Sequence, residues 1–340
     1  NELEQKAKER SKKAQKTHHE FFDKNFFQDF AKTHNPSEFT GYESTDSHSR
    51  ILALIKDNRF TDTLKEGEKG LIILDKTPFY AEKGGQKGDS GMLHKNGCRF
   101  IVNDCQTPYE GIIVHIGEVK SGSFQKQDKI EAKIDTAKRE LISNNHSSTH
   151  ILHWALETVL GEHVKQSGSL VDDKKLRFDY THDKALAKEE IRSIESLVNA
   201  RIREDLPVRA YEMSISKAAE KKEIKQFFGE KYLETVRVID MGFSKELCGG
   251  THTKNLAKIG LFKIVKDSSI ASGIRRIEAL TGFEAEKHVH ENENLLYTLS
   301  DLLKTKPSKL KEKAENFIEE KKLLEEELDL AKKIIRRTAV

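Results

Sequence analysis

The segment from Asn145 to Gly161, NHSSTHILHWALETVLG, constrains the fold of this chain more than any other. His146 and His150 are four residues apart, which places both imidazoles on one face of a helix. Gly161 is a typical helix stop. The helix itself is predicted by apolar residues that recur at helical spacing, namely Ile151, Leu152, Ala155, Leu156, Val159 and Leu160.

The distant run CGGTH supplies natural partners for these histidines, because Gly249 and Gly250 allow a tight turn that aims Cys248 and His252 at one point. Each histidine alone would be an ordinary core or surface residue, and a lone cysteine a small buried hydrophobe. Together the two motifs predict a metal site whose borderline-soft ligands suit Zn²⁺ best. Ser147 stands where HExxH metalloproteases carry their general-base glutamate, which excludes that class.

The composition of the chain limits which binding partners and which cellular compartment are expected. A net charge of +3 is too small to imply nucleic acid by itself, so a tRNA-binding chain must concentrate its lysines and arginines locally. The three cysteines, Cys98, Cys105 and Cys248, do not form a disulfide framework, which favours a reducing, cytoplasmic location. No apolar run reaches the length of a membrane span, and no signal peptide opens the chain. A start at Asn1 without methionine fits a fragment or a processed protein.

Four segments of different character follow one another, and α+β is the expected fold class. Glycines alternate with short β-rich runs in residues 35–140, which predicts a small antiparallel β-barrel. Helices and strands alternate in residues 141–285, which predicts helices packed on an antiparallel sheet. Residues 286–340 return to helix. Residues 1–34 are predicted to form an amphipathic helical connector that buries Phe21, Phe22, Phe26, Phe27 and Phe30.

Several shorter patterns refine this organisation. Gly84 and Gly85 in EKGGQKGDSG allow backbone to approach a phosphate, although a hairpin turn alone explains them. SGSLVDDKKLRFDYT predicts a hairpin that turns at residues 172–175, and KAAEKKEIKQFF predicts a helix. Beyond Pro307, a coiled-coil-like heptad pattern with one polar break favours an antiparallel hairpin or a dimer seam. Its seam positions are Leu310, Ala314, Phe317, Lys321, Leu324, Leu328, Ala331 and Ile335.

The motifs NHSSTHILHWAL, QSGSLV, RFDY, FFGEKY, VRVIDMGFSKELCGGTHT and SGIRRIEALTG resemble the editing domain of alanyl-tRNA synthetases. Free-standing deacylases called AlaX share this domain. TPFYAEKGGQKGDSG resembles the β-barrel that precedes editing in both groups, so the resemblance covers residues 35–285. It implies that the N-terminal helix follows an aminoacylation module. No segment here resembles that ATP-dependent module or the family's globular C-terminal domain.

The resemblance also implies roles for further residues. It places an editing pocket beside the metal, with Thr149 and Gln166 as its catalytic residues; the threonine position is associated with serine discrimination. Without the resemblance, Thr149 would simply bond its own helix backbone. Asp179, Arg275 and Arg276 are candidates for substrate or tRNA contact, with ion pairs to neighbouring carboxylates as the alternative for the arginines. A closed four-ligand metal would be structural, and three ligands with a water would be catalytic.

The expected activity is hydrolysis of tRNA(Ala) mischarged with serine or glycine, in a fragment of an alanine–tRNA ligase. A free-standing AlaX-type deacylase is the close alternative, and a non-catalytic, zinc-stabilised tRNA-binding module is the alternative from another class. No membrane partner is expected. A homodimer through the C-terminal helices is the expectation for a full-length protein.

Overall fold

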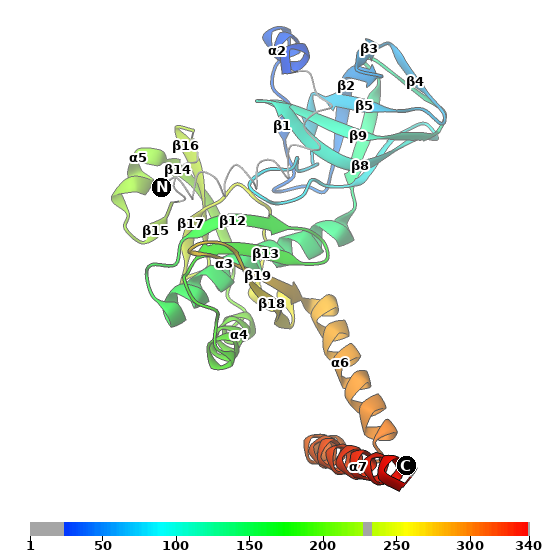
Figure 1. The fold of residues 1–340 in the computed structure, drawn as a ribbon. Helices are drawn as coiled ribbons and strands as arrows, with labels where there is room; N and C mark the ends of the chain where they lie inside the picture. Colours follow the sequence, from blue (N-terminus) through cyan, green and yellow to red (C-terminus); the bar gives the residue numbers. More distant parts are fainter. Residues whose placement is uncertain (1–23, 227–232, 339–340) are drawn as a thin grey trace. The chain divides into compact units, whose positions relative to one another are not determined.

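The computed structural model describes residues 24–226 and 233–338 (Figure 1). Contacts divide the chain into two units, residues 1–284 and residues 285–340. The expected α+β class is confirmed, because a closed antiparallel barrel is followed by helices and two four-stranded sheets. Phe21, Phe22 and the run FFGEKY lie outside the described residues.

Six strands close the barrel in the order β2-β5-β9-β8-β7-β11, and β11 returns to pair with β2. Successive side chains on a strand point to opposite faces, so alternate residues such as Leu93, Phe100, Val102 and Phe124 fill the interior. The short pairs β1–β6 and β4–β10, together with β3 on the edge of β2, complete this region. Its strands are β1 (Glu38–Phe39), β2 (Asp46–Lys56), β3 (Arg59–Thr61), β4 (Thr63–Lys65), β5 (Lys69–Leu74), β6 (Lys76–Thr77), β7 (Gly91–Lys95), β8 (Cys98–Tyr109), β9 (Ile112–Ser121), β10 (Ser123–Gln125) and β11 (Lys129–Ile134).

The N-terminal helix α2 (Lys24–Thr33) packs on the outside of the barrel. Phe27 and Phe30 are buried against Ile73 and Val114, and Phe26 stacks on a ring of β3 with centroids 4.2 Å apart. The predicted amphipathic pattern is therefore confirmed for the phenylalanines among the described residues.

A single long helix, α3 (Thr136–Leu160), leaves the barrel directly after β11. Asp135 caps it by accepting a hydrogen bond from the backbone N–H of Lys138 at 3.1 Å. It ends at Gly161, as predicted. Because the helix begins well before His146, the two histidines lie in its middle, and the expected domain boundary after residue 140 falls inside it.

The remainder of this unit contains two four-stranded sheets, ordered β12-β13-β19-β18 and β14-β16-β17-β15. Helices α3 and α4 share one buried core with the first sheet, where Leu152, Leu156, Phe178 and Val198 are fully enclosed. The elements are β12 (Gln166–Val171), β13 (Leu176–Thr181), α4 (Lys188–Arg203), β14 (Arg209–Ser214), α5 (Ile215–Glu220), β15 (Ile224–Lys225), β16 (Thr235–Asp240), β17 (Lys245–Leu247), η1 (Leu256–Ile259), β18 (Phe262–Ala271) and β19 (Ile274–Thr281).

Two local predictions have different outcomes. The hairpin at residues 172–175 is confirmed, with Asp172 N–H donating to the Lys175 carbonyl at 3.1 Å. The helix predicted for KAAEKKEIKQFF is wrong from Lys221 to Gln226, and its last two residues lie outside the described part of the chain. There the chain becomes strand β15, in which Ile224 pairs with Lys245 of β17, because tertiary pairing overrides a weak helical pattern.

The second unit is helical, as expected. Helix α6 (Gly282–Leu302) begins just before the boundary and is followed by η2 (Pro307–Lys309) and α7 (Leu310–Thr338). The heptad residues Phe317, Leu324 and Leu328 are exposed on α7. Among the described residues, no helix is long and apolar enough to cross a membrane.

A tight turn joins the barrel to the first four-stranded sheet. Lys83 and Gln86 exchange backbone hydrogen bonds around Gly84 and Gly85, whose φ angles are +61° and +86°. Two positive φ angles define the two-residue hairpin turn that favours glycine. The carbonyl of Gly85 accepts from the N–H of Val171 at 2.8 Å, so the turn is hydrogen-bonded to β12. The glycine pair is therefore explained by a turn and a close packing contact.

An ion pair holds α3 against the same barrel region. The Arg139 guanidinium pairs with Asp89, and both residues are buried. Arg139 also donates to the carbonyls of Gly41 at 2.8 Å and Pro78 at 2.9 Å. Because every partner lies in the barrel region, this contact fixes where α3 presents its histidines.

Candidate metal centre

His146, His150, Cys248 and His252 converge on one point, with all four ligand atoms within 4.8 Å of one another. The histidine pair comes from α3, while the cysteine and His252 come from the loop that follows β17. The Nε2 atoms of His146 and His252 each lie 3.4 Å from the Cys248 sulfur. The predicted pairing of the HxxxH and CGGTH motifs is therefore present in the structure.

The glycines of the CGGTH loop permit this convergence. A Cβ on Gly250 would lie 2.0 Å from the Cε1 atom of His146 and 2.8 Å from the Oε1 atom of Gln86. No side chain fits there without displacing a ligand. A glycine at this position is thus required by close approach to the imidazole.

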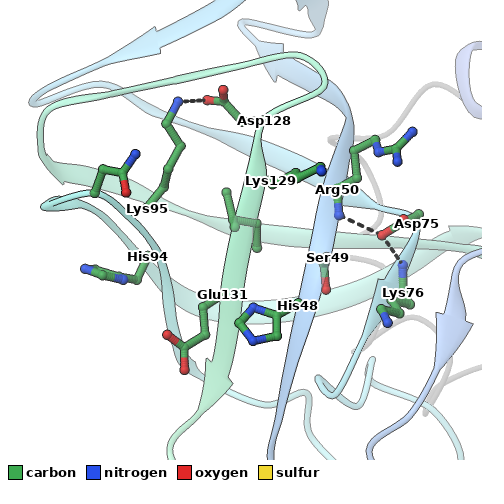
Figure 2. Close-up of a pocket in the computed structure, with 12 residues that line it drawn as sticks. His48, Ser49, Arg50, Asp75, Lys76, His94, Lys95, Asp128, Lys129 and Glu131 are labelled. Carbon is green, nitrogen blue, oxygen red and sulfur yellow. Dashed lines mark hydrogen bonds and ion pairs between the residues drawn. The ribbon is translucent and has the colours of Figure 1, made fainter.

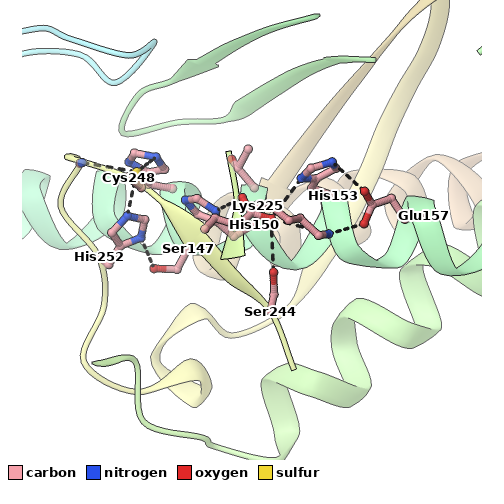
Figure 3. Close-up of polar contacts among 12 residues, drawn as sticks. Ser147, His150, His153, Glu157, Lys225, Ser244, Cys248 and His252 are labelled. Carbon is pink, nitrogen blue, oxygen red and sulfur yellow. Dashed lines mark hydrogen bonds and ion pairs between the residues drawn. The ribbon is translucent and has the colours of Figure 1, made fainter. Parts of the chain in front are cut away.

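Each histidine of the cluster uses its Nδ1 atom for a protein contact. Nδ1 of His146 lies 2.7 Å from Gln86 Oε1, and Nδ1 of His150 lies 2.5 Å from Glu246 Oε2. Nδ1 of His252 lies 3.2 Å from the Ser147 hydroxyl, a contact drawn in Figure 3. These contacts direct the three Nε2 atoms inward, as outer partners of metal-ligating histidines do.

A buried, unsatisfied nitrogen supports the fit to a metal. The Nε2 atom of His150 is enclosed and has no hydrogen-bond partner within the described part of the chain. A buried polar atom without a partner is costly unless something else satisfies it. Three imidazoles and one thiolate are the donor set that Zn²⁺ accepts in tetrahedral sites, so the residues present fit this ion.

The surroundings of Cys248 and His252 shift their pKa values toward the protonation states that bind a metal, a thiolate and a neutral imidazole. Burial opposes ionisation of Cys248, but His146 and His252 lower the pKa of its thiol well below the ordinary value. Burial and the neighbouring His146 lower the pKa of His252 to about 3. For His150, burial acts in the opposite direction to Glu246, and the carboxylate raises the pKa to about 10. A cation that binds here must therefore displace a proton from His150.

Glu246 extends the cluster into a wider polar network (Figure 3). Its carboxylate also contacts Nδ1 of His153 at 3.1 Å and accepts from the Ser244 hydroxyl at 3.2 Å. Lys225 reaches both Glu246 and Glu157. The buried charge of Glu246 is thus shared by partners from α3, from β15 and from the turn before β17, which fixes its position beside His150.

A cavity of about 350 Å³ opens beside the cluster, and its lining includes both residues predicted to be catalytic, Thr149 and Gln166. His252 is the one member of the cluster that does not line it. The Thr149 hydroxyl donates its proton to the carbonyl of Asn145 at 2.9 Å. Its oxygen can therefore only accept a hydrogen bond from a bound substrate. Gln166 opens β12 and is half-buried. The rest of the lining is Tyr80, Lys83, Gly84, His146, His150, Ser169, Leu233, Thr235, Val236, Arg237, Glu246, Leu247, Cys248, Gly249 and Gly250.

Asp179, Arg275 and Arg276 do not line this cavity. Arg276 donates to both carboxylate oxygens of Asp179 at 2.7 and 2.8 Å across β13 and β19. Arg275 pairs with Asp267, with bonds of 3.0 and 2.6 Å. Both arginines therefore make the ion pairs that the sequence offered as the alternative to phosphate contact.

Sequence reasoning missed the partners of the ligands, namely Gln86, Ser147 and Glu246. Two of them had a local signal. Glu246 lies on β17 and precedes Cys248, in the following loop, by only two residues. Ser147 adjoins His146 directly. Gln86 had no local signal in the sequence, because only folding brings its turn in the barrel region next to α3.

A second, larger hollow of about 760 Å³ lies on the barrel (Figure 2). Lysine and aspartate face each other there, as in the 2.5 Å pair between Lys95 and Asp128. The backbone N–H groups of Arg50 and Lys76 both donate to Asp75. Among the described residues, the group of metal-ligating side chains lies at the other cavity and not in this hollow.

Comparison with known proteins places this site in a class. Residues 1–138 match the sequence profile described as tRNA synthetases class II (A), and residues 236–278 match the threonyl and alanyl tRNA synthetase second additional domain. The second match includes Glu246, Cys248 and His252. The barrel and the four-ligand site thus belong to a class II aminoacyl-tRNA synthetase of the threonyl and alanyl type.

Similarity to individual relatives narrows the class. The chain is 44% identical over 321 residues to the alanine–tRNA ligase of Chlamydia caviae, covering 94% of this chain and 36% of the relative. It is 45% identical over 332 residues to the alanine–tRNA ligase of Chlamydia muridarum, covering 98% of this chain and 37% of the relative. With the enzyme of Acetivibrio thermocellus the identity is 45% over 294 residues, covering 86% of this chain and 33% of the relative. The chain belongs to the alanyl-tRNA synthetase family and spans about a third of the length of these curated relatives.

Proposed function

We propose that this chain is the editing part of an alanine–tRNA ligase and hydrolyses tRNA(Ala) that carries serine or glycine. One observation carries the proposal: a single cavity is lined by Thr149 and by three members of the four-residue cluster, His146, His150 and Cys248. Family membership supports tRNA as the partner. The four-ligand set favours zinc held by His146, His150, Cys248 and His252.

Serine is read by a hydrogen bond that alanine cannot make. Because Thr149 donates its own proton to Asn145, its oxygen is free to accept the proton of a serine hydroxyl. Gln166, with both a donor and an acceptor, orients the ester or the attacking water. Zinc held by all four residues would have no open position and would order the wall of the cavity, whereas zinc held by three of them would supply Lewis acidity. Glycine is small enough to enter, but no contact within the described cavity selects it.

Editing complements what the aminoacylation module of such a ligase achieves. A pocket shaped for alanine discriminates poorly against serine, which adds only a hydroxyl, and against the smaller glycine. A second site that binds the hydroxyl removes the serine product. The proposed reaction therefore acts on the ester after transfer to tRNA, and it needs no ATP.

The decisive experiment compares Ser-tRNA(Ala) with Ala-tRNA(Ala) in single-turnover deacylation by the zinc-loaded chain. Thr149→Val keeps the shape and removes the acceptor, so the serine-over-alanine rate ratio should fall about tenfold, the value of one hydrogen bond. Zinc content should not change. Ser148→Ala is the matched control, because its hydroxyl makes the same type of backbone bond to Asn144 but does not line the cavity.

Other outcomes discriminate the alternatives. An unchanged ratio in the Thr149 variant, with zinc present, would mean that another group reads the serine. Absence of hydrolysis by the intact wild-type chain, with zinc and tRNA both bound, would favour the non-catalytic tRNA-binding module. Loss of zinc in Cys248→Ala identifies the thiolate as a ligand. A cytoplasmic location and a homodimer through the α7 heptads accompany this proposal as further predictions.

A further inference from the structure

We propose that Gln86, in the glycine turn of the barrel, is a positioning residue that sets the tautomer of the metal ligand His146. The proposal rests on the metal site described above and assigns part of its construction to the barrel. Gln86 is fully buried and lies sixty positions from His146 in sequence. Its side chain makes three hydrogen bonds. Together they allow only one orientation of the Gln86 amide and one position of the proton on the His146 imidazole.

The first step is the orientation of the Gln86 amide. Its Oε1 atom lies 2.8 Å from the backbone N–H of Thr251, a group that can only donate. Its Nε2 atom donates to the Thr251 hydroxyl at 2.8 Å. Rotating the amide by half a turn would set two donors against each other at the backbone N–H. Oxygen therefore faces both Thr251 N–H and His146.

The second step follows for the imidazole. Oε1 of Gln86 lies 2.7 Å from Nδ1 of His146 and can only accept, so Nδ1 must carry the proton and donate. In the neutral ring the lone pair is then on Nε2, the atom 3.4 Å from the Cys248 sulfur. Gln86 thus fixes the ligand form of His146 and the direction in which its lone pair points.

The turn itself holds Gln86 in place. Gln86 closes the Lys83–Gln86 hairpin and bridges to Val171 of β12. Thr251, its other partner, lies inside the CGGTH loop between two metal ligands. The Gln86 amide therefore links α3 to the CGGTH loop, while the backbone of its turn bonds β12. The proposed metal centre is thus built from both the barrel and the α+β region.

Zinc affinity of the intact 340-residue chain, measured by competition with a chelator, tests the proposal. Gln86→Met keeps the length of the side chain but removes the acceptor. The variant should bind zinc about 10–100-fold more weakly, which is the usual effect of losing an outer partner of a metal ligand. Gln86→Glu keeps an acceptor for both N–H groups and should stay within about threefold of wild type. Gln106→Met is the matched control, because Gln106 is a buried barrel glutamine that bonds Glu82 and Asp104 instead.

A second readout is independent of the metal. In the zinc-free chain labelled with ¹⁵N-histidine, His146 should carry its proton on Nδ1 in wild type and in Gln86→Glu, and lose this preference in Gln86→Met. Wild-type affinity and an unchanged tautomer in Gln86→Met would overturn the proposal, as would equal losses in Met and Glu variants. Failure of the wild-type chain to bind zinc would reject the metal site, while the tautomer would still decide the role of Gln86.

Discussion

Identical side chains acquire different chemistry from their immediate contacts. His150 and His252 lie in one cluster, yet a carboxylate raises the pKa of the first to about 10, and burial beside another imidazole lowers that of the second to about 3. His115, inside the barrel, is fully buried between the carbonyl of Ile72 and the hydroxyl of Thr77. Burial lowers the pKa of His115 to about 4.

His115 predicts an acid sensitivity of the barrel. Its pKa is about 6.5 when unfolded and about 4 when folded, so between these values the unfolded state binds more protons. The free energy of unfolding is fully retained above pH 6.5 and falls as pH drops toward 4. At pH 5 the loss is about 2 kcal/mol.

Urea unfolding at pH 7.5 and pH 5.0 measures this loss. His115→Gln can replace the two hydrogen bonds without titrating, so the variant should lose less stability between the two pH values. Equal losses in wild type and variant would assign the acid sensitivity to other groups.

At the level of residues, local spacing was sufficient to find the four residues that the structure brings together, and their role as metal ligands stays a prediction. His146 and His150 share a helix face, and Cys248 and His252 share a glycine loop, so short patterns in the sequence contain this information. The amide of Gln86 acts across a contact between distant segments, and no periodicity encodes it. The ion pairs of Arg275 and Arg276 likewise depend on which carboxylate lies across the sheet.

Among the elements, the glycine turn deserves a direct test because its two glycines differ in surroundings. A Cβ on Gly85 would lie 2.4 Å from the Ser169 carbonyl oxygen, whereas nothing lies within 4 Å of one on Gly84. Both have positive φ, so alanine at either position is strained by about 1–2 kcal/mol. Gly85→Ala should be worse by a further ~1–3 kcal/mol, because it also clashes with β12.

Equilibrium unfolding of the two alanine variants separates strain from clash. Hydrogen exchange of the Val171 amide, which donates to the Gly85 carbonyl, should accelerate in Gly85→Ala and stay near wild type in Gly84→Ala. Equal stability and equal exchange in both variants would show that the contact with β12 is dispensable.

Elements with strong periodicity were predicted well. The barrel strands, α3 and α7 each repeat an apolar pattern over many residues, and the predicted hairpin at residues 172–175 is confirmed. The helix beyond Glu220 was wrong, because a two-residue strand exists only through its partner β17. The start of α3 was also missed, since its first turns carry few apolar residues.

For the whole molecule, the C-terminal helix is predicted to be separable from the metal centre. Among the described residues, the four hydrophobic cores draw no buried side chain from α7. Deleting residues 308–340 should therefore leave zinc content at one per chain and the thermal midpoint nearly unchanged. Metal analysis and calorimetry of the shortened protein measure both. A large loss of zinc would show that the tail supports the core.

The turn at Lys83–Gln86 has a consequence for solubility. β12 is the outer strand of its sheet, and outer strands present unpaired backbone groups that invite pairing with other chains. Hydrogen bonds of Val171 with Gly85 and Lys87 occupy one end of that strand. A protein trimmed to the α+β region alone would therefore expose the backbone groups of Val171 at this edge, and we expect it to aggregate more readily than the full chain.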